Sequence, residues 1–299
     1  MTAAKRPLLT CGIMIATHNR RADLAKTLRF LEKLTPPPHE VLICADGCED
    51  GTEETVRTIS PQVRLLVNAH ARGSVKSRNQ LMREAKSNLI LSLGDDSYPV
   101  EPDFISRVIT LFERDPKLGV LTFPQRSDEF QETLEQTDFG PVLEVGSYTN
   151  SGSVIRRDLF LRLGGYMSMF FHQYEEPDFA VRVIAAGFRI RFEPSLTVRH
   201  HYTTQLRDEL RTHHYHARNE FWSALMRCPL LQLPGICAFR LIRQLIYAIR
   251  RGPRWVLREP QWWFRAVTGL NKPLRERRPL SWTSYRRWLR LVHNPEQFS

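Results

Sequence analysis

The sequence predicts an α/β fold in which a mostly parallel central sheet is covered by helices. In the first 114 residues, short apolar segments alternate with segments whose apolar residues recur at helical spacing. Residues 89–93 read Leu-Ile-Leu-Ser-Leu, a pattern typical of a central parallel strand that is buried on both faces. Together these observations indicate strands joined by right-handed helical crossovers, with the carboxyl ends of the strands at one edge of the sheet.

The individual elements follow from local signals along the chain. We expect strands over residues 9–16, 40–45, 63–67 and 119–124, a further strand from residue 89 that ends at Asp95 and Asp96, and helices over residues 21–34, 52–59, 75–85 and 102–114. Three prolines at positions 36–38 end the first helix, and Asp50 with Gly51 forms the turn before the second. Residues 125–145 are polar and poorly periodic, which predicts a loop or flap. Beyond it we expect a helix over residues 179–186 and short strands over 189–192 and 196–198.

After Tyr202 the pattern becomes helical. One helix is expected from about residue 206 to just before Pro229, and another over residues 237–251. In the latter, leucine and isoleucine residues lie opposite arginines, which is the pattern of a basic amphipathic helix. We therefore divide the chain into an α/β domain, residues 1–205, and a basic amphipathic helical extension, residues 206–299.

The positive charge of the chain indicates which kind of partner it binds. The net charge of +11 and the sequence pI of about 9.8 indicate an anionic partner. Arginines are dense between residues 240 and 290, where tryptophans accompany them, and this mixture favours a membrane surface that carries anionic lipid. Alternatively, these helices pack on the α/β domain or on another protein and leave the basic face in solvent. No nucleic-acid reader motif accompanies the charge, so we expect no nucleic-acid partner.

Cysteine usage and apolar patterning indicate the compartment. The cysteine count is 5, with no pair at CxxC spacing, which favours a reduced compartment. Residues 1–7 contain no apolar core of a signal peptide, and no apolar stretch approaches the roughly 20 residues of a membrane span. We expect a cytoplasmic protein that lies peripherally on the inner face of the cytoplasmic membrane.

Polar residues follow three of the predicted strands at the point where each strand ends. Residues 17–20 follow the first strand, Asp46 follows the second, and Asp95 and Asp96 follow the fourth. The carboxyl ends of parallel strands are where open α/β sheets bind ligands. Because two adjacent carboxylates repel each other, we expect a cation beside them, for which a divalent ion with oxygen ligands is the natural candidate.

The order of several segments is more specific than any one of them. Residues 12–20, 41–52, 72–79 and 91–97 are followed by residues 164–166, 174–182, 186–190 and 198–200. Together they resemble the family 2 glycosyltransferases, which have the GT-A fold, a mostly parallel Rossmann-like sheet flanked by helices. The resemblance covers about residues 10–205 and implies a bacterial enzyme of cell-envelope or polysaccharide biosynthesis.

The resemblance also implies site residues. A nucleotide-diphosphate-sugar donor would lie against Thr17, His18, Asn19, Arg20, Asp46, Arg72, Gly73, Arg78 and Asp95, with Asp46 at the base. Asp96 and His200 would hold Mg²⁺ or Mn²⁺, with His201 as the alternative ligand. Gly165 and Asp178 would lie on the acceptor side. This chain has Gly94 and Ala45 where many members carry an acid, which leaves the number of metal ligands and the choice of base open.

Two adjacent glutamates are the candidates for catalysis. Glu176 aligns with the family's acidic residue that acts as general base, and Glu175 would orient it or bind an acceptor hydroxyl, although the two roles can be exchanged. A carboxylate can remove the proton of the attacking hydroxyl, while a divalent cation stabilises charge on the departing diphosphate. Alternatively, the pair is an acidic helix N-terminus favoured by the helix dipole.

The function implied is that of an inverting hexosyltransferase. It would move a sugar from a nucleotide-diphosphate-sugar donor to a lipid-linked or cell-envelope glycan acceptor. The alternative is a catalytically inactive GT-A-like binding or scaffold protein, for which Gly94 and Ala45 would be the first signs of decay. The sequence leaves the sugar, the nucleotide, the acceptor and the oligomeric state open.

Overall fold

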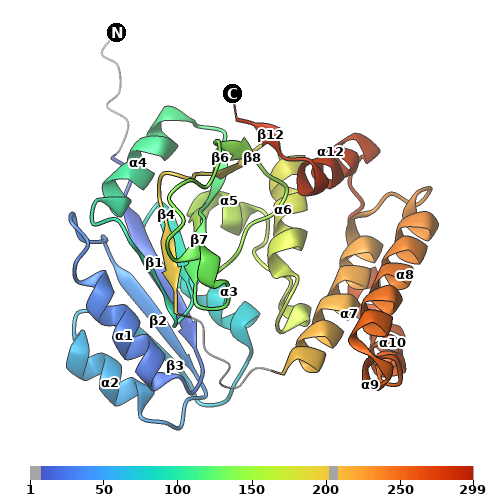
Figure 1. Cartoon of the computed structure of the whole chain (residues 1–299), viewed down its shortest axis with the longest axis horizontal. Coiled ribbons are helices and arrows are strands. Elements are labelled where there is room, and N and C mark those ends of the chain that lie inside the picture. Colours follow the sequence, from blue (N-terminus) through green and yellow to red (C-terminus); the bar gives the residue numbers. More distant parts are fainter. Residues whose placement is uncertain (1–7, 202–207, 299) are drawn as a thin grey trace.

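A nine-stranded sheet forms the centre of the computed structural model, which describes residues 8–201 and 208–298 (Figure 1). Half of the sheet is parallel, in the order β4-β1-β2-β3. Its strands are β1 (Cys11–Thr17), β2 (Val41–Asp46), β3 (Arg64–Asn68) and β4 (Leu89–Leu93). The predicted fold class and the order of these strands with their helices are confirmed.

The other half of the sheet is mixed. β6 (Leu118–Thr122) and β10 (Arg189–Phe192) run parallel to each other, whereas β9 (Gly152–Arg156) lies antiparallel between β4 and β6. β8 (Leu143–Glu144) and β12 (Glu296–Gln297) are antiparallel strands at the edge. The sequence prediction missed β9, because its short apolar segment follows a polar stretch without a periodic signal.

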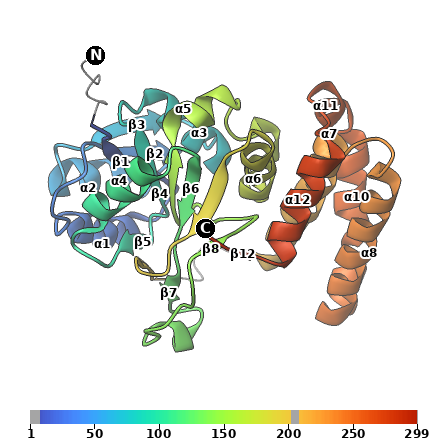
Figure 2. The same cartoon turned by 90° about the horizontal axis from the view of Figure 1, so that it is seen from above.

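Helices cover both faces of the sheet, as Figure 2 shows edge-on. One core contains residues of α1 (Arg21–Leu31), α2 (Thr52–Ile59) and α4 (Phe104–Arg114). The other contains residues of α3 (Ser74–Glu84), α5 (Arg157–Arg162) and α6 (Glu175–Ala185). Side chains of β1 alternate between the two, with Met14 in one core and Ile13 and Ile15 in the other.

A small second sheet follows the acidic end of β4. It consists of β5 (Ser97–Pro99), β11 (Val198–His200) and β7 (Gln125–Ser127), with β11 in the middle. His200 pairs with Ser97, which directly follows the two aspartates. The predicted loop at residues 125–145 is therefore only partly a loop, since it holds β7, β8 and the short 3-10 helix η1 (Gln131–Thr133). A second 3-10 helix, η2, spans Ser168–Phe170.

The extension is helical, as expected, and lies beside α6 (Figures 1 and 2). Its helices are α7 (Glu209–Arg227), α8 (Leu233–Arg251), α9 (Pro253–Val256), α10 (Glu259–Thr268), α11 (Asn271–Arg275) and α12 (Trp282–His293). The boundary that we place at residue 205 falls in residues 202–207, outside the described ranges. The chain then returns to the α/β domain, where β12 joins the main sheet beside β8. Of the helices in the described ranges, none is both long and apolar enough to cross a bilayer.

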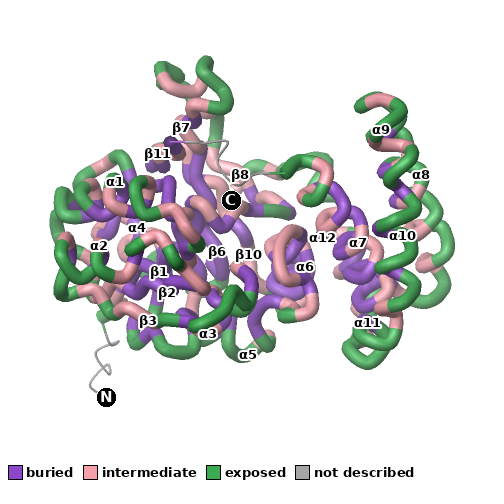
Figure 3. The backbone as a smooth tube through the Cα atoms, turned by 90° about the horizontal axis from the view of Figure 1, so that it is seen from below, coloured by how far each residue is buried: buried purple, intermediate pink, exposed green. Residues whose placement is uncertain are grey.

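The basic amphipathic helix α8 packs through its polar side. Arg240 and Gln244 are buried, and both hydrogen-bond to Glu220 of α7, through the backbone oxygen and the carboxylate respectively. Arg243 pairs with the same carboxylate. The apolar residues on the opposite side of the helix are exposed, as the green outer side of α8 in Figure 3 shows. A solvated basic face, the alternative that the sequence left open, is therefore wrong for Arg240.

Asp178 ties α6 to α7. Its carboxylate is fully buried and accepts hydrogen bonds from Arg182, Arg227 and Ser223. The nearest Arg182 nitrogen lies 2.9 Å from Oδ2, and the nearest Arg227 nitrogen lies 3.0 Å from Oδ1. The two arginines lower the pKa of Asp178 despite its burial. This ion cluster joins the α/β domain to the extension.

We predict that Asp178→Asn destabilises the protein by about 3–5 kcal/mol, because it leaves two buried guanidinium groups without their counter-charge. Urea unfolding followed by circular dichroism measures the change. Asp158→Asn is the matched control, since Asp158 forms the same i,i+4 pair with Arg162 on α5 but both side chains are exposed. The control should cost less than about 1 kcal/mol. Equal costs for the two variants would contradict the structural role of the cluster.

Candidate active site

The strand-end residues meet at one edge of the parallel sheet. Thr17 is in register with Ala45 across the β1–β2 pair, and Ile15 is in register with Leu93 across the β1–β4 pair. The residues that follow these strands therefore leave the sheet at the same edge. This confirms the geometric part of the sequence prediction.

Arg20 supplies a cation to both adjacent carboxylates. Its Nη1 donates to Asp95 Oδ1 at 2.6 Å, and its Nη2 donates to Asp96 Oδ2 at 2.8 Å. The Thr17 hydroxyl donates to the other Asp95 oxygen at 2.8 Å. Asn19 has a φ of 51°, so the chain turns sharply between the strand and the arginine. The sequence predicts a cation beside the aspartates, and the protein itself provides one.

The pKa values of the Asp95 and Asp96 carboxyls are shifted in opposite directions. Burial raises the pKa of Asp95 to about 6, although the charge of Arg20 opposes the shift. Burial also acts to raise the pKa of Asp96, but the hydrogen bond and charge of His200, together with Arg20, lower it below its usual range. Asp96 is therefore the more firmly ionised carboxylate, as a metal ligand requires.

Asp96 and His200 are the residues that could bind a divalent cation. His200 Nε2 lies 3.2 Å from Asp96 Oδ1, the oxygen that Arg20 does not bind in the contacts above. Residues 8–201 and 208–298 contain no group of three or more histidines, cysteines and acids positioned to hold a metal. Two protein ligands nevertheless fit Mg²⁺ or Mn²⁺, which is commonly bound by one or two carboxylates together with substrate phosphates and water. His201, the alternative ligand, has its Nε2 at 3.8 Å from Asp23.

Steric crowding explains why glycine occupies position 94 in this chain. A Cβ atom at this position would lie 2.6 Å from Asp96 Oδ1, the atom that faces His200. An acid in its place would push the Asp96 carboxylate away from His200. The departure from the family pattern therefore accompanies a particular placement of Asp96.

Asp46 holds the loop that precedes α3. Its carboxylate accepts hydrogen bonds from the backbone of Arg72 at 3.0 Å, the backbone of Gly73 at 2.8 Å and the Asn68 side chain at 2.8 Å. Its backbone oxygen lies 2.7 Å from His18 Nδ1. Gly73 has a φ of +92°, and a Cβ there would lie 2.6 Å from Phe171, so only glycine fits. Asp46 thus brings the predicted donor-binding segments together, while its contact with a nucleobase stays a prediction.

The two glutamates lie in the first turn of α6, which begins at Glu175. The backbone N–H of Asn150 donates to Glu176 Oε1 at 3.2 Å, and the Asn150 side chain donates to Glu175 Oε1 at 3.4 Å. Arg78 Nη1 lies 3.7 Å from the same Glu175 oxygen. In the described part of the chain, the buried Oε2 of Glu175 has no hydrogen-bond partner.

The surroundings of Glu176 bring the pKa of its carboxyl close to neutral pH. Burial and, next, the charge of Glu175 raise the pKa of Glu176 to about 7. Burial also raises the pKa of Glu175, although Arg78 opposes this shift. A carboxylate with a pKa near the working pH is suited to general base catalysis.

Asn150 connects the glutamates to the centre of the sheet. Its side-chain oxygen accepts hydrogen bonds from Tyr166 at 2.6 Å and from Ser92 of β4 at 3.4 Å. The hydroxyls of Tyr166 and Tyr148 are 3.0 Å apart. The sequence analysis missed Asn150 and Tyr148 because neither belongs to a motif, and only the fold brings them beside α6.

The two residues predicted on the acceptor side, Gly165 and Asp178, are both buried and packed against other parts of the protein. Gly165 is buried with a φ of +67°, and a Cβ there would lie 2.8 Å from Asn79 Oδ1. Asp178 points into the ion cluster with Arg182 and Arg227. Their acceptor-side role stays a prediction, and the contacts of Asp178 do not support it.

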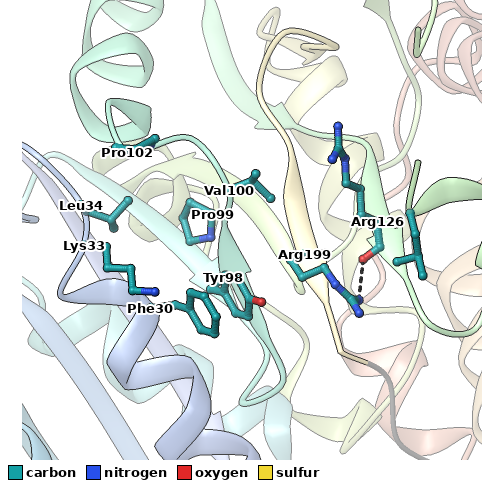
Figure 4. A pocket seen from close by; sticks show the side chains of 10 residues that line it. Phe30, Lys33, Leu34, Tyr98, Pro99, Val100, Pro102, Arg126 and Arg199 are labelled. Carbon is teal, nitrogen blue, oxygen red and sulfur yellow. Dashed lines mark hydrogen bonds between the residues drawn. The ribbon is translucent and has the colours of Figure 1, made fainter. Parts of the chain in front are cut away.

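A separate cavity of about 570 Å³ lies on the small sheet (Figure 4). Among the residues that line it, Tyr98 stacks on Phe30 with ring centroids 3.8 Å apart, and Arg199 donates to the Arg126 backbone oxygen at 3.0 Å. Because side chains alternate along a strand, Arg199 and its neighbour His200 project from opposite faces of β11. The cavity is therefore distinct from the Asp96–His200 site.

Comparison with known proteins supports the fold. A structure of residues 1–349 of S. aureus TarS aligns with a TM-score of 0.62 at 16% identity, over 86% of this chain and 79% of that one. The mannosyltransferase PcManGT from Pyrobaculum calidifontis, solved with GDP-Man and Mn²⁺, aligns with a TM-score of 0.58 at 17% identity, over 93% and 84% of the two chains. The fold is GT-A, as the resemblance implies.

Curated sequences lead to the same class. An uncharacterised glycosyltransferase of Haemophilus influenzae is 23% identical over 62% of this chain and 63% of its own length. The pre-mycofactocin glycosyltransferase of Mycobacterium tuberculosis is 25% identical over 66% of this chain but only 43% of its own length. This chain thus spans less than two thirds of either relative. The sequence model of glycosyl transferase family 2 matches residues 12–176, more than half of the chain, and the chain therefore belongs to this family.

Proposed function

We propose that the protein is an inverting, metal-assisted glycosyltransferase that moves a sugar from a nucleotide-diphosphate-sugar donor to a hydroxyl of a glycan acceptor. The observation that carries the proposal is the connection between the two halves of the site. Glu176, whose pKa is raised to about 7, is joined through Asn150 to Ser92 of β4, the strand that Asp95 and Asp96 follow. Asn150 thus links the candidate base on α6 to the strand that the metal-ligand candidate follows.

The donor would lie at the carboxyl edge of the sheet. Asp96 and His200 would hold Mg²⁺ or Mn²⁺, which stabilises charge on the departing diphosphate when it is bound. Arg20 faces both aspartates and adds fixed positive charge at the same place. The loop held by Asp46 would close over the nucleoside.

Glu176 would act as the general base. With its pKa near 7, it is largely ionised at slightly alkaline pH and can accept the proton of the attacking hydroxyl. Glu175 would raise that pKa through its charge and orient the acceptor through its unpartnered oxygen. Direct attack by the acceptor inverts the configuration of the anomeric carbon.

The acceptor would be a lipid-linked or cell-envelope glycan. The excess of arginine in the extension suits an anionic membrane surface, at which such an acceptor is presented. The enzyme would then work in the cytoplasm on the inner face of the membrane.

We predict that Glu176→Gln lowers the transfer rate by about 10²–10⁴-fold, because it removes the base, while nucleotide binding is retained. Asp96→Asn should instead weaken Mn²⁺-dependent binding of UDP or GDP by at least about tenfold. Calorimetric titration and a panel of nucleotide sugars measure the two effects.

Glu54→Gln is the control for these variants, because Glu54 is an exposed carboxylate on α2. It should change neither property. If Glu176→Gln and Asp96→Asn left both transfer and binding intact, the site would not be catalytic, and the inactive scaffold would be the better description.

The pH profile tests the coupling of the two glutamates. The base is active when ionised, so kcat/KM should fall as the pH drops through the Glu176 pKa of about 7. Glu175→Gln removes a neighbouring negative charge that raises this pKa, so the acid limb should move to lower pH. An acid limb that stayed in place or moved to higher pH would contradict the assignment of Glu176 as the base.

A further inference from the structure

The positive charge of the chain is concentrated in one segment of the extension. Residues 228–292 contain fourteen arginines and lysines but only two glutamates and no aspartate, a net charge of +12, whereas the whole chain carries +11. The rest of the chain is therefore almost neutral. The net positive charge that favours an anionic surface is therefore carried by this segment.

The same segment carries an apolar strip on α8. Phe239, Ile242, Ile246 and Ile249 recur at helical spacing on one side of the helix, and their side chains are 43–58% exposed. The opposite side of α8 is already occupied, because Arg240, Gln244 and Ala248 are buried against the neighbouring helices. The strip therefore stays uncovered in the described part of the chain.

A second apolar strip lies on α10. Trp263, Phe264 and Val267 are exposed there, while Trp262 and Ala266 on the inner side pack against α7 and Leu241 of α8. Both α8 and α10 stand at the end of the molecule that is farthest from α1 and α2, as Figures 1 and 2 show. Large exposed apolar patches of this kind mark interaction surfaces.

The apolar surface continues inward from α8. Phe239 also lines a cavity of about 310 Å³ between α6, α8 and α12, beside Ile236 and Trp288. Tyr174 and Pro177, which flank Glu175 and Glu176 in sequence, also line this cavity. Phe239 thus belongs both to the outer strip and to this cavity, whose wall also carries Glu220 and Arg240.

We propose that the apolar strip of α8 is a membrane-contact surface that inserts into the boundary between headgroups and acyl chains of an anionic bilayer. This rests on the membrane partner in the proposed function and assigns it to particular residues. Apolar insertion combined with like-signed flanking charge is the pattern of in-plane membrane helices. Arg250 on α8 and Arg254 on α9 are exposed and would meet anionic headgroups, each contributing electrostatic attraction.

Co-sedimentation of the full chain with vesicles tests the proposal. The protein should bind vesicles of phosphatidylcholine with phosphatidylglycerol more tightly than vesicles of phosphatidylcholine alone, and added salt should reduce the difference. Ile242→Ser with Ile246→Ser should weaken binding to the anionic vesicles by at least about tenfold, because it removes two inserted side chains. Arg250→Gln with Arg254→Gln should reduce the preference for anionic vesicles and leave binding to phosphatidylcholine alone unchanged.

The matched control replaces two exposed apolar residues of the α/β domain, Val67→Ser with Leu161→Ser, and should bind vesicles as the unmodified chain does. Mn²⁺-dependent UDP and GDP binding, measured on the same preparations, reports on the donor site separately and should not change. Vesicle binding that survives the isoleucine changes would overturn the proposal. So would light scattering that shows a dimer which these changes dissociate, with no vesicle binding, because a second copy would then cover the strip.

Discussion

The contact of Arg20 with Asp95 and Asp96 is the interaction on which the donor edge depends. Two adjacent carboxylates buried at the end of β4 would repel each other and lose hydration, at a cost of several kcal/mol for each charge. Arg20 offsets both at once, and it can do so only because Asn19 turns the chain back towards β4. The ends of β1 and β4 are thereby fixed relative to each other.

The same contact restricts where a metal ion can bind. Asp96 Oδ2 lies 2.8 Å from Arg20 Nη2, and Asp96 Oδ1 lies 3.2 Å from His200 Nε2. A cation held at the Oδ1 side would leave the Arg20 contact in place. Gly94 is part of this arrangement, because a side chain there would occupy the space beside Oδ1. The missing acid at position 94 is therefore compatible with the proposed metal site at Asp96.

The sequence predicts those parts of the fold and site that depend on local pattern. The apolar run of β4 and the acids after it are readable because burial on both faces requires a continuous apolar strand. The position of Asn150 in the site cannot be predicted from a local pattern of this kind. Its place beside the glutamates arises because β9 pairs antiparallel with β4, with Gly152 opposite Leu93, which brings the preceding residues to the end of β4. Pairing of segments about 60 residues apart leaves no periodic signal in either one.

The orientation of α8 is a second feature that the local sequence pattern does not determine. Its sequence has an apolar side and an arginine side, but amphipathicity alone does not determine which of them faces inward. The choice is made by Glu220 on α7, a buried carboxylate that needs counter-charge and receives it from Arg240 and Arg243. Once that cluster forms, the isoleucines must point outward, where apolar surface in water is unfavourable by about 25 cal/mol per Å². A bilayer that covers the strip would remove this cost, so the ion cluster that orients α8 would also create the surface by which the enzyme reaches its acceptor.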